Sequence, residues 1–286
     1  MFNIPNLLTG CNLLFGTVSI ILTFSGRIEL AVLAIFAGAI CDFFDGFAAR
    51  LLKKQGELGK QLDSLADIIT FGVAPGMIVF VLLILSGAWD ILLSQDLSLD
   101  EMWLDGTMGY SIQHWITVYF NDLVGNQSPF YLSHFYGWYL VLPFGALFIP
   151  FMSMFRLAKF NLDTRQAEHF IGLPTPANGI FFASFALLIW DGFGSSDWRT
   201  SLSMTLIKDQ VLMTFVIVFS VLLVSEFSLF SLKFKSLKWK GNQVRYVFIV
   251  SSIILFSLLY VWSIPLIILL YLLLAMVTNK VAKISE

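Results

Sequence analysis

Long apolar runs dominate the pattern of the chain. Several are roughly 17 to 25 residues long, enough to cross a hydrocarbon core of about 30 Å as a helix. The last two could instead form one hairpin broken at Pro265, because proline interrupts a helix. We therefore predict an all-α polytopic membrane protein with about eight transmembrane helices. The predicted windows are 8–26, 30–52, 62–86, 138–157, 174–191, 210–231, 246–261 and 264–279.

The composition supports this prediction. Hydrophobic residues make up 58% of the 286 residues and charged residues 13%, and the mean hydropathy is +0.83. Soluble domains are much more polar. Residues Met1 to Thr9 contain no basic region and no small-x-small cleavage site follows, so we expect the first helix to be retained. No linker or repeat is visible, which indicates a single membrane domain over residues 1–286.

Basic residues indicate how the helices are oriented, because lysine and arginine favour cytoplasmic loops. Fourteen of the 17 fall on one side of the predicted topology, and only Arg27, Arg199 and Lys208 fall on the other. Segment 87–137 has six acidic residues and no basic ones. We expect it to be an outer-face insertion along the membrane interface, or alternatively a substrate lid. Both termini are predicted to be cytoplasmic, in the cell membrane. The basic residues are explained by topology, so no nucleic-acid partner is expected.

One polar cluster interrupts the apolar pattern. At about 100° per residue, its acidic and small residues form one stripe on each of two successive helices. The connection between these helices is short, so they should be antiparallel neighbours. Four carboxylates would then gather near the cytoplasmic end of the pair. The stripes consist of Asp42, Asp45, Gly46 and Ala49 on the first helix, and of Gly59, Asp63 and Asp67 on the second.

Four carboxylates at membrane depth require positive charge among them, because each buried charge is costly and like charges repel. A single intramembrane aspartate is often just paired or water-facing, but four on facing stripes favour a binding site. Only oxygen ligands are available, which favours Mg²⁺ or Mn²⁺. Gly46 and Ala49 leave a notch beside the aspartates that would fit a nucleotide diphosphate.

The full motif, D-x-x-D-G-x-x-A-R-x8-G-x-x-x-D-x-x-x-D, resembles the signature of the CDP-alcohol phosphotransferases. This resemblance implies two divalent ions held by Asp42, Asp45, Asp63 and Asp67 against the pyrophosphate of a CDP-linked lipid, with Asp67 also acting as general base. It further implies a six-helix core, here with two additional helices, and a homodimer. The motif positions Gly46, Ala49, Arg50 and Gly59 are expected to bind CDP.

Three other stretches resemble the phosphatidylserine synthase branch of that family: NIPNLLTGCNLLFG at 3–16, LDSLADIITFGVAPG at 62–76 and RLAKFNLDTRQAEHFIGLPTPANG at 156–179. The reaction implied is transfer of a phosphatidyl group from CDP-diacylglycerol to L-serine, which yields phosphatidylserine and CMP. Segment 87–137 departs from compact family members.

Basic residues after the fourth window are candidates for gripping serine or a lipid phosphate. A carboxylate is best recognised by the donor fork of arginine. Arg156 is the first candidate, followed by Arg165 and Lys159, although topology anchoring explains the same residues. Asn6 and Thr9 are expected to precede the first helix, and they could bind cytidine or cap that helix.

Three alternatives remain at this point. The same chemistry could use glycerol phosphate or inositol phosphate as the acceptor, although such acceptors should need more basic residues. A divalent-cation transporter would also use buried aspartates, but its acids are expected near the bilayer centre in repeated or broken helices. A prenyltransferase would use aspartate pairs as well, yet the small residues on the acidic stripe fit CDP-alcohol transfer better.

Overall fold

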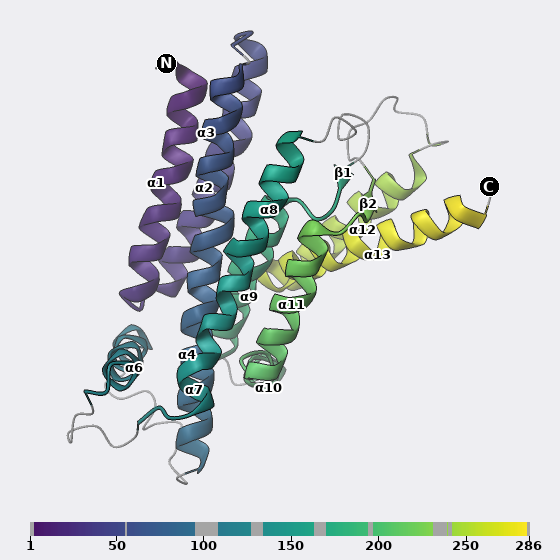
Figure 1. Ribbon diagram of the computed structural model, residues 1–286. Helices are drawn as coiled ribbons and strands as arrows, with labels where there is room; N and C mark the ends of the chain where they lie inside the picture. Colours follow the sequence, from purple (N-terminus) through teal and green to yellow (C-terminus); the bar gives the residue numbers. More distant parts are fainter. Residues whose placement is uncertain are drawn as a thin grey trace.

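The computed structural model describes residues 3–54, 56–94, 108–126, 134–162, 170–193, 197–230, 239 and 242–284. The chain forms a bundle of long helices, with one helical pair projecting from its side (Figure 1). In chain order, the main helices are α1 (Ile4–Phe24), α2 (Ile28–Leu51), α3 (Glu57–Asp67), α4 (Ala74–Ser94), α6 (Met108–Leu123), α7 (Trp138–Val141), α8 (Phe148–Leu162), α9 (Thr175–Phe193), α10 (Trp198–Leu206), α11 (Asp209–Val224), α12 (Gln243–Leu259) and α13 (Ser263–Ile284).

Shorter elements connect these helices. A π-helix, η1 (Ile68–Val73), joins α3 to α4, and the 3₁₀ segments η2 (Leu142–Leu147) and η4 (Tyr260–Trp262) join α7 to α8 and α12 to α13. Within the described residues, the strands are β1 (Phe170–Ile171) and β2 (Ser228–Leu229), which pair antiparallel with Phe170 opposite Leu229. The fold is thus all-α in its architecture, as predicted.

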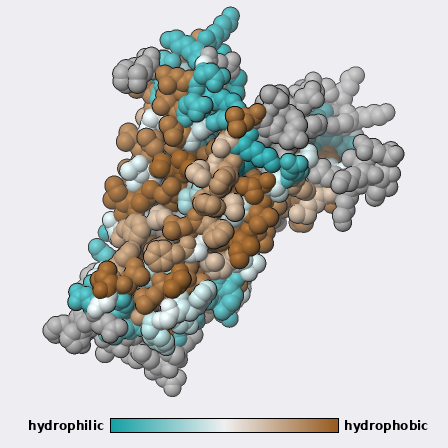
Figure 2. Space-filling view, in the orientation of Figure 1, coloured by the Kyte–Doolittle hydropathy of each residue, from teal (hydrophilic) through white to brown (hydrophobic). Residues whose placement is uncertain are grey.

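Five described helical segments are long and apolar enough to cross a membrane, or six if α10 and α11, bent by 66°, count as one span. Every predicted window overlaps a helix, but window 210–231 runs past the end of α11 at Val224 into β2. Helices α9 and α11 are not among the five segments, and α12 and α13 fall within one segment. An apolar band covers the middle of the visible face and polar residues gather toward its ends (Figure 2). These features confirm the prediction of a polytopic membrane protein.

Helix α1 begins earlier than its apolar run. The Asn3 side chain caps it by accepting a hydrogen bond from the backbone N–H of Asn6 at 2.9 Å, and Pro5 occupies the first turn, where its missing N–H has no cost. The expectation that Asn6 and Thr9 precede the first helix was therefore wrong. Both lie inside α1, and Asn3 is the capping residue.

The buried face of α1 is polar and small rather than apolar. Leu14 and Ile21, in contrast, are 63% and 62% exposed. This inverted pattern suits a lipid-facing helix, whose apolar side chains can face the bilayer while small and polar ones pack against other helices. The buried positions are Pro5, Thr9, Asn12, Gly16, Ser19 and Thr23.

The π-helix η1 follows Asp67 directly and is held by tight packing. Thr70 donates its hydroxyl to the Asn12 carbonyl at 2.8 Å. Gly16 of α1 and Gly38 of α2 leave room for it: a Cβ at Gly16 would lie 2.8 Å from Thr70 Cα, and one at Gly38 would lie 2.7 Å from Thr70 Cγ2. Helices α1 and α2 are thereby fixed against the element that carries Asp67.

The C-terminal windows form a hairpin, but its break is not at Pro265. Helix α12 ends at Leu259, and Tyr260, the first residue of η4, adopts a positive φ of 48°. Helices α12 and α13 then pack against each other (Figure 1). Pro265 lies in the first turn of α13, where a helix tolerates proline.

Part of segment 87–137 is helical and packs on the bundle. Helix α6 contacts α4, and Tyr119 is fully buried, with its hydroxyl donated to the Leu140 carbonyl at 2.8 Å. The Asp122 carboxylate accepts the backbone N–H of Phe135 and contacts His134 Nδ1, both at 2.7 Å. Helix α6 lies at the opposite end of the bundle from the α2–α3 connection (Figure 1), so it does not form a lid over the aspartates.

Candidate active site

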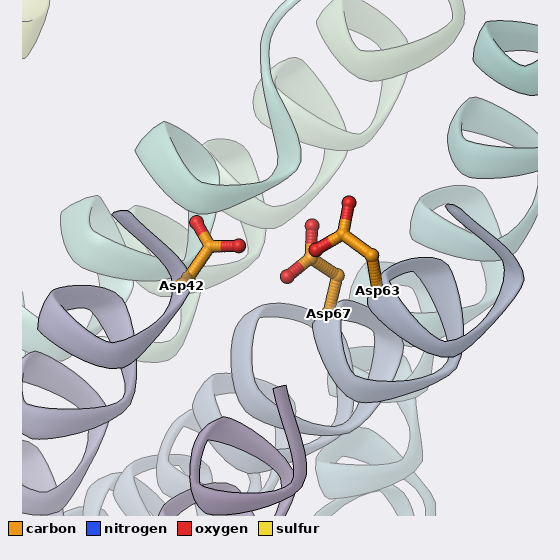
Figure 3. Close-up of side chains that lie close together, drawn as sticks. All are labelled: Asp42, Asp63 and Asp67. Atoms are coloured by element: carbon orange, nitrogen blue, oxygen red, sulfur yellow. The ribbon is translucent and has the colours of Figure 1, made fainter. Parts of the chain in front are cut away.

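Three of the four predicted aspartates meet where α2 and α3 approach each other. Asp42 extends from α2, and Asp63 and Asp67 lie one turn apart on α3. One carboxylate oxygen from each lies within 4.8 Å of the others. Figure 3 shows the three carboxyl groups turned toward a common space. The two predicted acidic stripes therefore do face each other.

The fourth aspartate, Asp45, lies one turn along α2 and has a partner of its own. The Asp45 carboxylate accepts a hydrogen bond from the Thr9 hydroxyl at 2.5 Å, and Asp45 is buried, with 6% of its surface exposed. Asp45 is outside the group of three that are closest together. The hydrogen bond ties α1 to α2 beside the cluster.

Asn12 is a residue of this site that sequence reasoning did not identify. Its side-chain amide donates to Asp67 Oδ1 at 3.2 Å, and the residue is fully buried. The signal was present in the sequence, because Thr9, Asn12 and Gly16 form a stripe at helical spacing within an apolar window. This stripe marks the face of α1 that contacts the aspartates.

The donor set fits a hard cation. No lysine or arginine in the described part of the chain forms an ion pair with Asp42, Asp45, Asp63 or Asp67. Asp63 Oδ1 is buried without a hydrogen-bond partner among the described groups. Buried carboxylates normally have a compensating charge or hydrogen bonds. Clustered carboxylate oxygens are the ligands that Mg²⁺ and Mn²⁺ favour, so these residues can hold such ions.

A cavity of about 460 Å³ opens beside the cluster, between α1, α2 and the start of α3. Asp45 and Asp63 form part of its wall. A Cβ at Gly46 would meet no atom closer than 4.0 Å, so the absence of a side chain there leaves open space. Five of the six residues predicted to bind CDP line this cavity: Asn6, Thr9, Gly46, Ala49 and Gly59.

Basic groups flank the cavity. Arg50, the sixth predicted residue, is exposed and is not part of the lining, but its Nη1 is the atom 4.0 Å from the Cβ position of Gly46. Lys54 and Lys60 do line the cavity, and Lys60 Nζ donates to the Asn161 carbonyl at 2.8 Å. Lys54 is thus close enough to the cavity to meet an anionic ligand.

The structure separates the three basic candidates for serine or lipid phosphate. Arg156 is 3% exposed, its Nε donates to the Leu173 carbonyl at 3.1 Å, and its guanidinium lies 5.3 Å from the centre of the Phe160 ring. Lys159 forms an exposed ion pair with Glu226 at 3.3 Å. Arg165 lies outside the described residues. Burial of Arg156 in the protein is unlike the snorkelling expected of a surface anchor.

Comparison with known proteins agrees with this geometry. Residues 2–95, which include all four aspartates, match the family model described as CDP-alcohol phosphatidyltransferase. The chain is 30% identical over 177 residues to a CDP-diacylglycerol–serine O-phosphatidyltransferase of Bacillus subtilis, covering 62% of this chain and 71% of that protein.

Two further relatives extend the match. A CDP-diacylglycerol–serine O-phosphatidyltransferase of Helicobacter pylori is 25% identical over 256 residues, covering 89% of this chain and 82% of the relative. An archaetidylserine synthase of Methanothermobacter thermautotrophicus is 28% identical over 189 residues, covering 64% of this chain and 58% of the relative. The aspartate cluster and these similarities together lead to one conclusion: the chain belongs to the CDP-alcohol phosphatidyltransferase family.

Proposed function

We propose that this enzyme transfers the phosphatidyl group of CDP-diacylglycerol to L-serine, giving phosphatidylserine and CMP. The observation that carries the proposal is the approach of the Asp42, Asp63 and Asp67 carboxylates to within 4.8 Å beside a cavity of about 460 Å³. The choice of serine is supported by the names of the relatives from Bacillus subtilis and Helicobacter pylori.

Asp42, Asp45, Asp63 and Asp67 would hold two divalent ions, Mg²⁺ or Mn²⁺. When bound, such ions supply positive charge that neutralises the pyrophosphate and stabilises the leaving phosphate. Thr9 holds the Asp45 carboxylate through its 2.5 Å hydrogen bond, and Asn12 holds that of Asp67. These contacts from α1 restrict the rotamers of two carboxylates, as a preorganised ligand set requires.

The cavity between α1, α2 and α3 would receive the CDP moiety. Gly46, Ala49 and Gly59 present little side-chain bulk, so the nucleotide can approach the backbone, and Asn6 and Thr9 offer hydrogen-bonding groups. Arg50 and Lys54 lie at its edge, where they can attract the phosphates.

Asp67 would act as the general base. It accepts the proton of the serine hydroxyl as the serine oxygen forms a bond to the lipid-bearing phosphorus and the bond from that phosphorus to CMP breaks. The electron pair of the broken bond leaves with CMP. Asp67 is 7% exposed and is oriented by Asn12, which supports its assignment over the more exposed Asp63.

Arg156 would bind the serine carboxylate. Its burial and its contacts with the Leu173 carbonyl and the Phe160 ring hold the guanidinium in one position. Arginine is suited to bidentate recognition of a carboxylate. Lys159 is a weaker candidate because it is exposed and paired with Glu226, and a role for Arg165 stays a prediction from sequence.

The site would face the cytoplasm, where serine is available, and both termini would lie on that side of the cell membrane. The basic residues support this orientation because Arg50, Lys53, Lys54 and Lys60 surround the end of the bundle that carries the aspartates. The homodimer implied by the family resemblance also remains a proposal.

The test is CMP release by purified protein with CDP-diacylglycerol and Mn²⁺ or Mg²⁺, with L-serine, glycerol phosphate and inositol phosphate supplied in turn. Serine-dependent release should exceed that with the other alcohols. Release with a phosphorylated alcohol alone would assign a different acceptor to the same chemistry. Cation flux without any CMP release would favour a transporter.

A further inference from the structure

Asn178 and Ser153 are among the buried polar side chains that lack hydrogen-bond partners within the described residues. Neither Nδ2 nor Oδ1 of Asn178 has a partner, and neither does Oγ of Ser153. Both residues are fully buried. Buried amides and hydroxyls are nearly always hydrogen-bonded, so an amide with both ends open is typical of a group that meets a ligand or ordered water.

Asn178 lies in the first turn of α9, next to the elements that carry the aspartates. Helix α9 packs against both α2 and η1. Gly179, the residue that follows Asn178, lies so close to η1 that a Cβ at this position would be 2.8 Å from Phe71 Cα. Phe71 is one helical turn beyond Asp67, so Asn178 is at the depth of the turn that follows the proposed base.

Ser153 and Arg156 approach the same turn from α8. Asn161 Nδ2 donates to Ser64 Oγ at 2.8 Å, and Ser153 Cβ lies 3.1 Å from the Cβ position of Gly72. In both contacts the two residue numbers add up to the same value, so α8 runs antiparallel to the segment formed by α3 and η1. In this register Arg156 lies level with Ile69. Ile69 is two residues beyond Asp67, which is about 3 Å along the helix at 1.5 Å per residue. Ser153 and Arg156 are three residues apart and share one face of α8.

The polar groups Asn178, Ser153 and Arg156 of α8 and α9 do not line the nucleotide cavity. That cavity is lined by residues of α1, α2, α3 and the α2–α3 connection, and by no residue of α8 or α9. In phosphoryl transfer, the attacking and leaving oxygens lie roughly in line on opposite sides of the phosphorus. With CMP in the cavity, the acceptor alcohol would approach from the side of α8 and α9.

We propose that Asn178, supported by Ser153, binds the α-amino acid group of the acceptor and makes the site specific for it. This inference rests on the proposed function. Asn178 Oδ1 would accept a hydrogen bond from the ammonium group of serine, and Asn178 Nδ2 and the Ser153 hydroxyl would donate to its carboxylate beside Arg156. A site built to hydrogen-bond a polar group discriminates strongly against analogues that lack it.

The test measures CMP release by purified, full-length Asn178→Ala and wild-type protein with three acceptors: L-serine, 3-hydroxypropionate, which lacks the amino group, and ethanolamine, which lacks the carboxylate. For Asn178→Ala, the serine KM should rise about 10- to 100-fold, as for the loss of hydrogen bonds to a charged group. The preference for serine over 3-hydroxypropionate should shrink by a similar factor. The KM for CDP-diacylglycerol should stay within about twofold.

Ser184→Ala is the matched control, because Ser184 is buried in the same helix but already donates to the Phe181 carbonyl at 2.8 Å. It should leave serine KM and acceptor preference unchanged. If Asn178→Ala does not fold, Ser153→Ala is the smaller change, and its serine KM should still rise several-fold. Unchanged serine KM and acceptor preference in the folded variants would overturn the inference while the proposed function stands. Absence of serine-dependent release in the wild type would instead overturn the proposed function, and the inference with it.

Discussion

Asn12 of α1 donates its amide to Asp67 of α3, with 3.2 Å between Nδ2 and Oδ1. The same residue accepts the Thr70 hydroxyl through its backbone carbonyl at 2.8 Å. Asn12 therefore contacts both the proposed base and the π-helix that follows it. Helix α1, which contributes no acidic residue, fixes the position of the carboxylate on which the proposed chemistry depends.

Replacing Asn12 should impair turnover more than substrate binding. We expect Asn12→Ala to lower kcat about 10- to 100-fold, because a hydrogen bond to a charged carboxylate is lost. The KM for CDP-diacylglycerol should change little. Ser19→Ala is the control, since Ser19 is buried on the same face of α1 but two turns away. Steady-state CMP release gives kcat and KM for each variant. Equal kcat values for Asn12→Ala and Ser19→Ala would show that Asn12 does not position the base.

Packing around Thr70 should be sensitive to one added methyl group. A Cβ at Gly16 would lie 2.5 Å from Thr70 Oγ1 and 2.8 Å from its Cα, so the backbone must move. Gly16→Ala should destabilise the fold by about 1–3 kcal/mol, as expected for overpacking, and should reduce activity because η1 follows Asp67. At Gly10 in the same helix, no atom lies within 4 Å of a Cβ position. Thermal unfolding in detergent should therefore show a lower midpoint for Gly16→Ala than for Gly10→Ala.

The sequence predicted the acidic cluster because the cluster depends on local geometry. Residues at i and i+4 share a helix face, and a short connection makes two helices neighbours, so the meeting of Asp42 with Asp63 and Asp67 follows from spacing alone. The all-α polytopic fold likewise follows from the length and composition of the apolar runs.

Features set by contacts between distant segments could not be predicted in the same way. The π-helix η1 packs its Thr70 against Gly16 and Gly38, and nothing in residues 68–73 alone indicates it. Asn178 is separated from Asp67 by more than a hundred residues, and its open amide is visible only once α9 is packed on η1. The C-terminal hairpin was predicted to break at Pro265, but it breaks at Tyr260, five residues earlier, where the backbone φ is positive.

Metal titration should separate the base from a ligand. Asp42→Asn should weaken ion binding, so raised Mn²⁺ or Mg²⁺ should partly restore its activity, as for any loss of affinity. Asp67→Asn keeps an oxygen and the side-chain size but removes the basic carboxylate, so turnover should fall by about 10²–10⁴ without rescue. Activity of both variants is measured across metal concentrations. If added metal restores Asp67→Asn as well as it restores Asp42→Asn, Asp67 is a metal ligand and not the general base.

Orientation can be measured by labelling single cysteines in intact cells after Cys11 and Cys41 are replaced by alanine. Val124 is 73% exposed at the end of α6, and Leu52 is 42% exposed beside the α2–α3 connection. An impermeant thiol reagent should label Val124→Cys and not Leu52→Cys, because the proposed orientation places Leu52 on the cytoplasmic side. After cell lysis both should be labelled, which controls for reactivity. The opposite pattern would move the aspartates to the outer face.

The proposed reaction is measured most directly as incorporation of labelled L-serine into chloroform-soluble lipid by the purified wild-type protein, with CDP-diacylglycerol and Mn²⁺ or Mg²⁺. We expect labelled phosphatidylserine and an equal amount of CMP. EDTA should abolish both products and either ion should restore them, because the aspartate cluster needs a cation to hold a pyrophosphate. Full incorporation in the presence of EDTA, or no labelled lipid under any metal condition, would contradict this expectation.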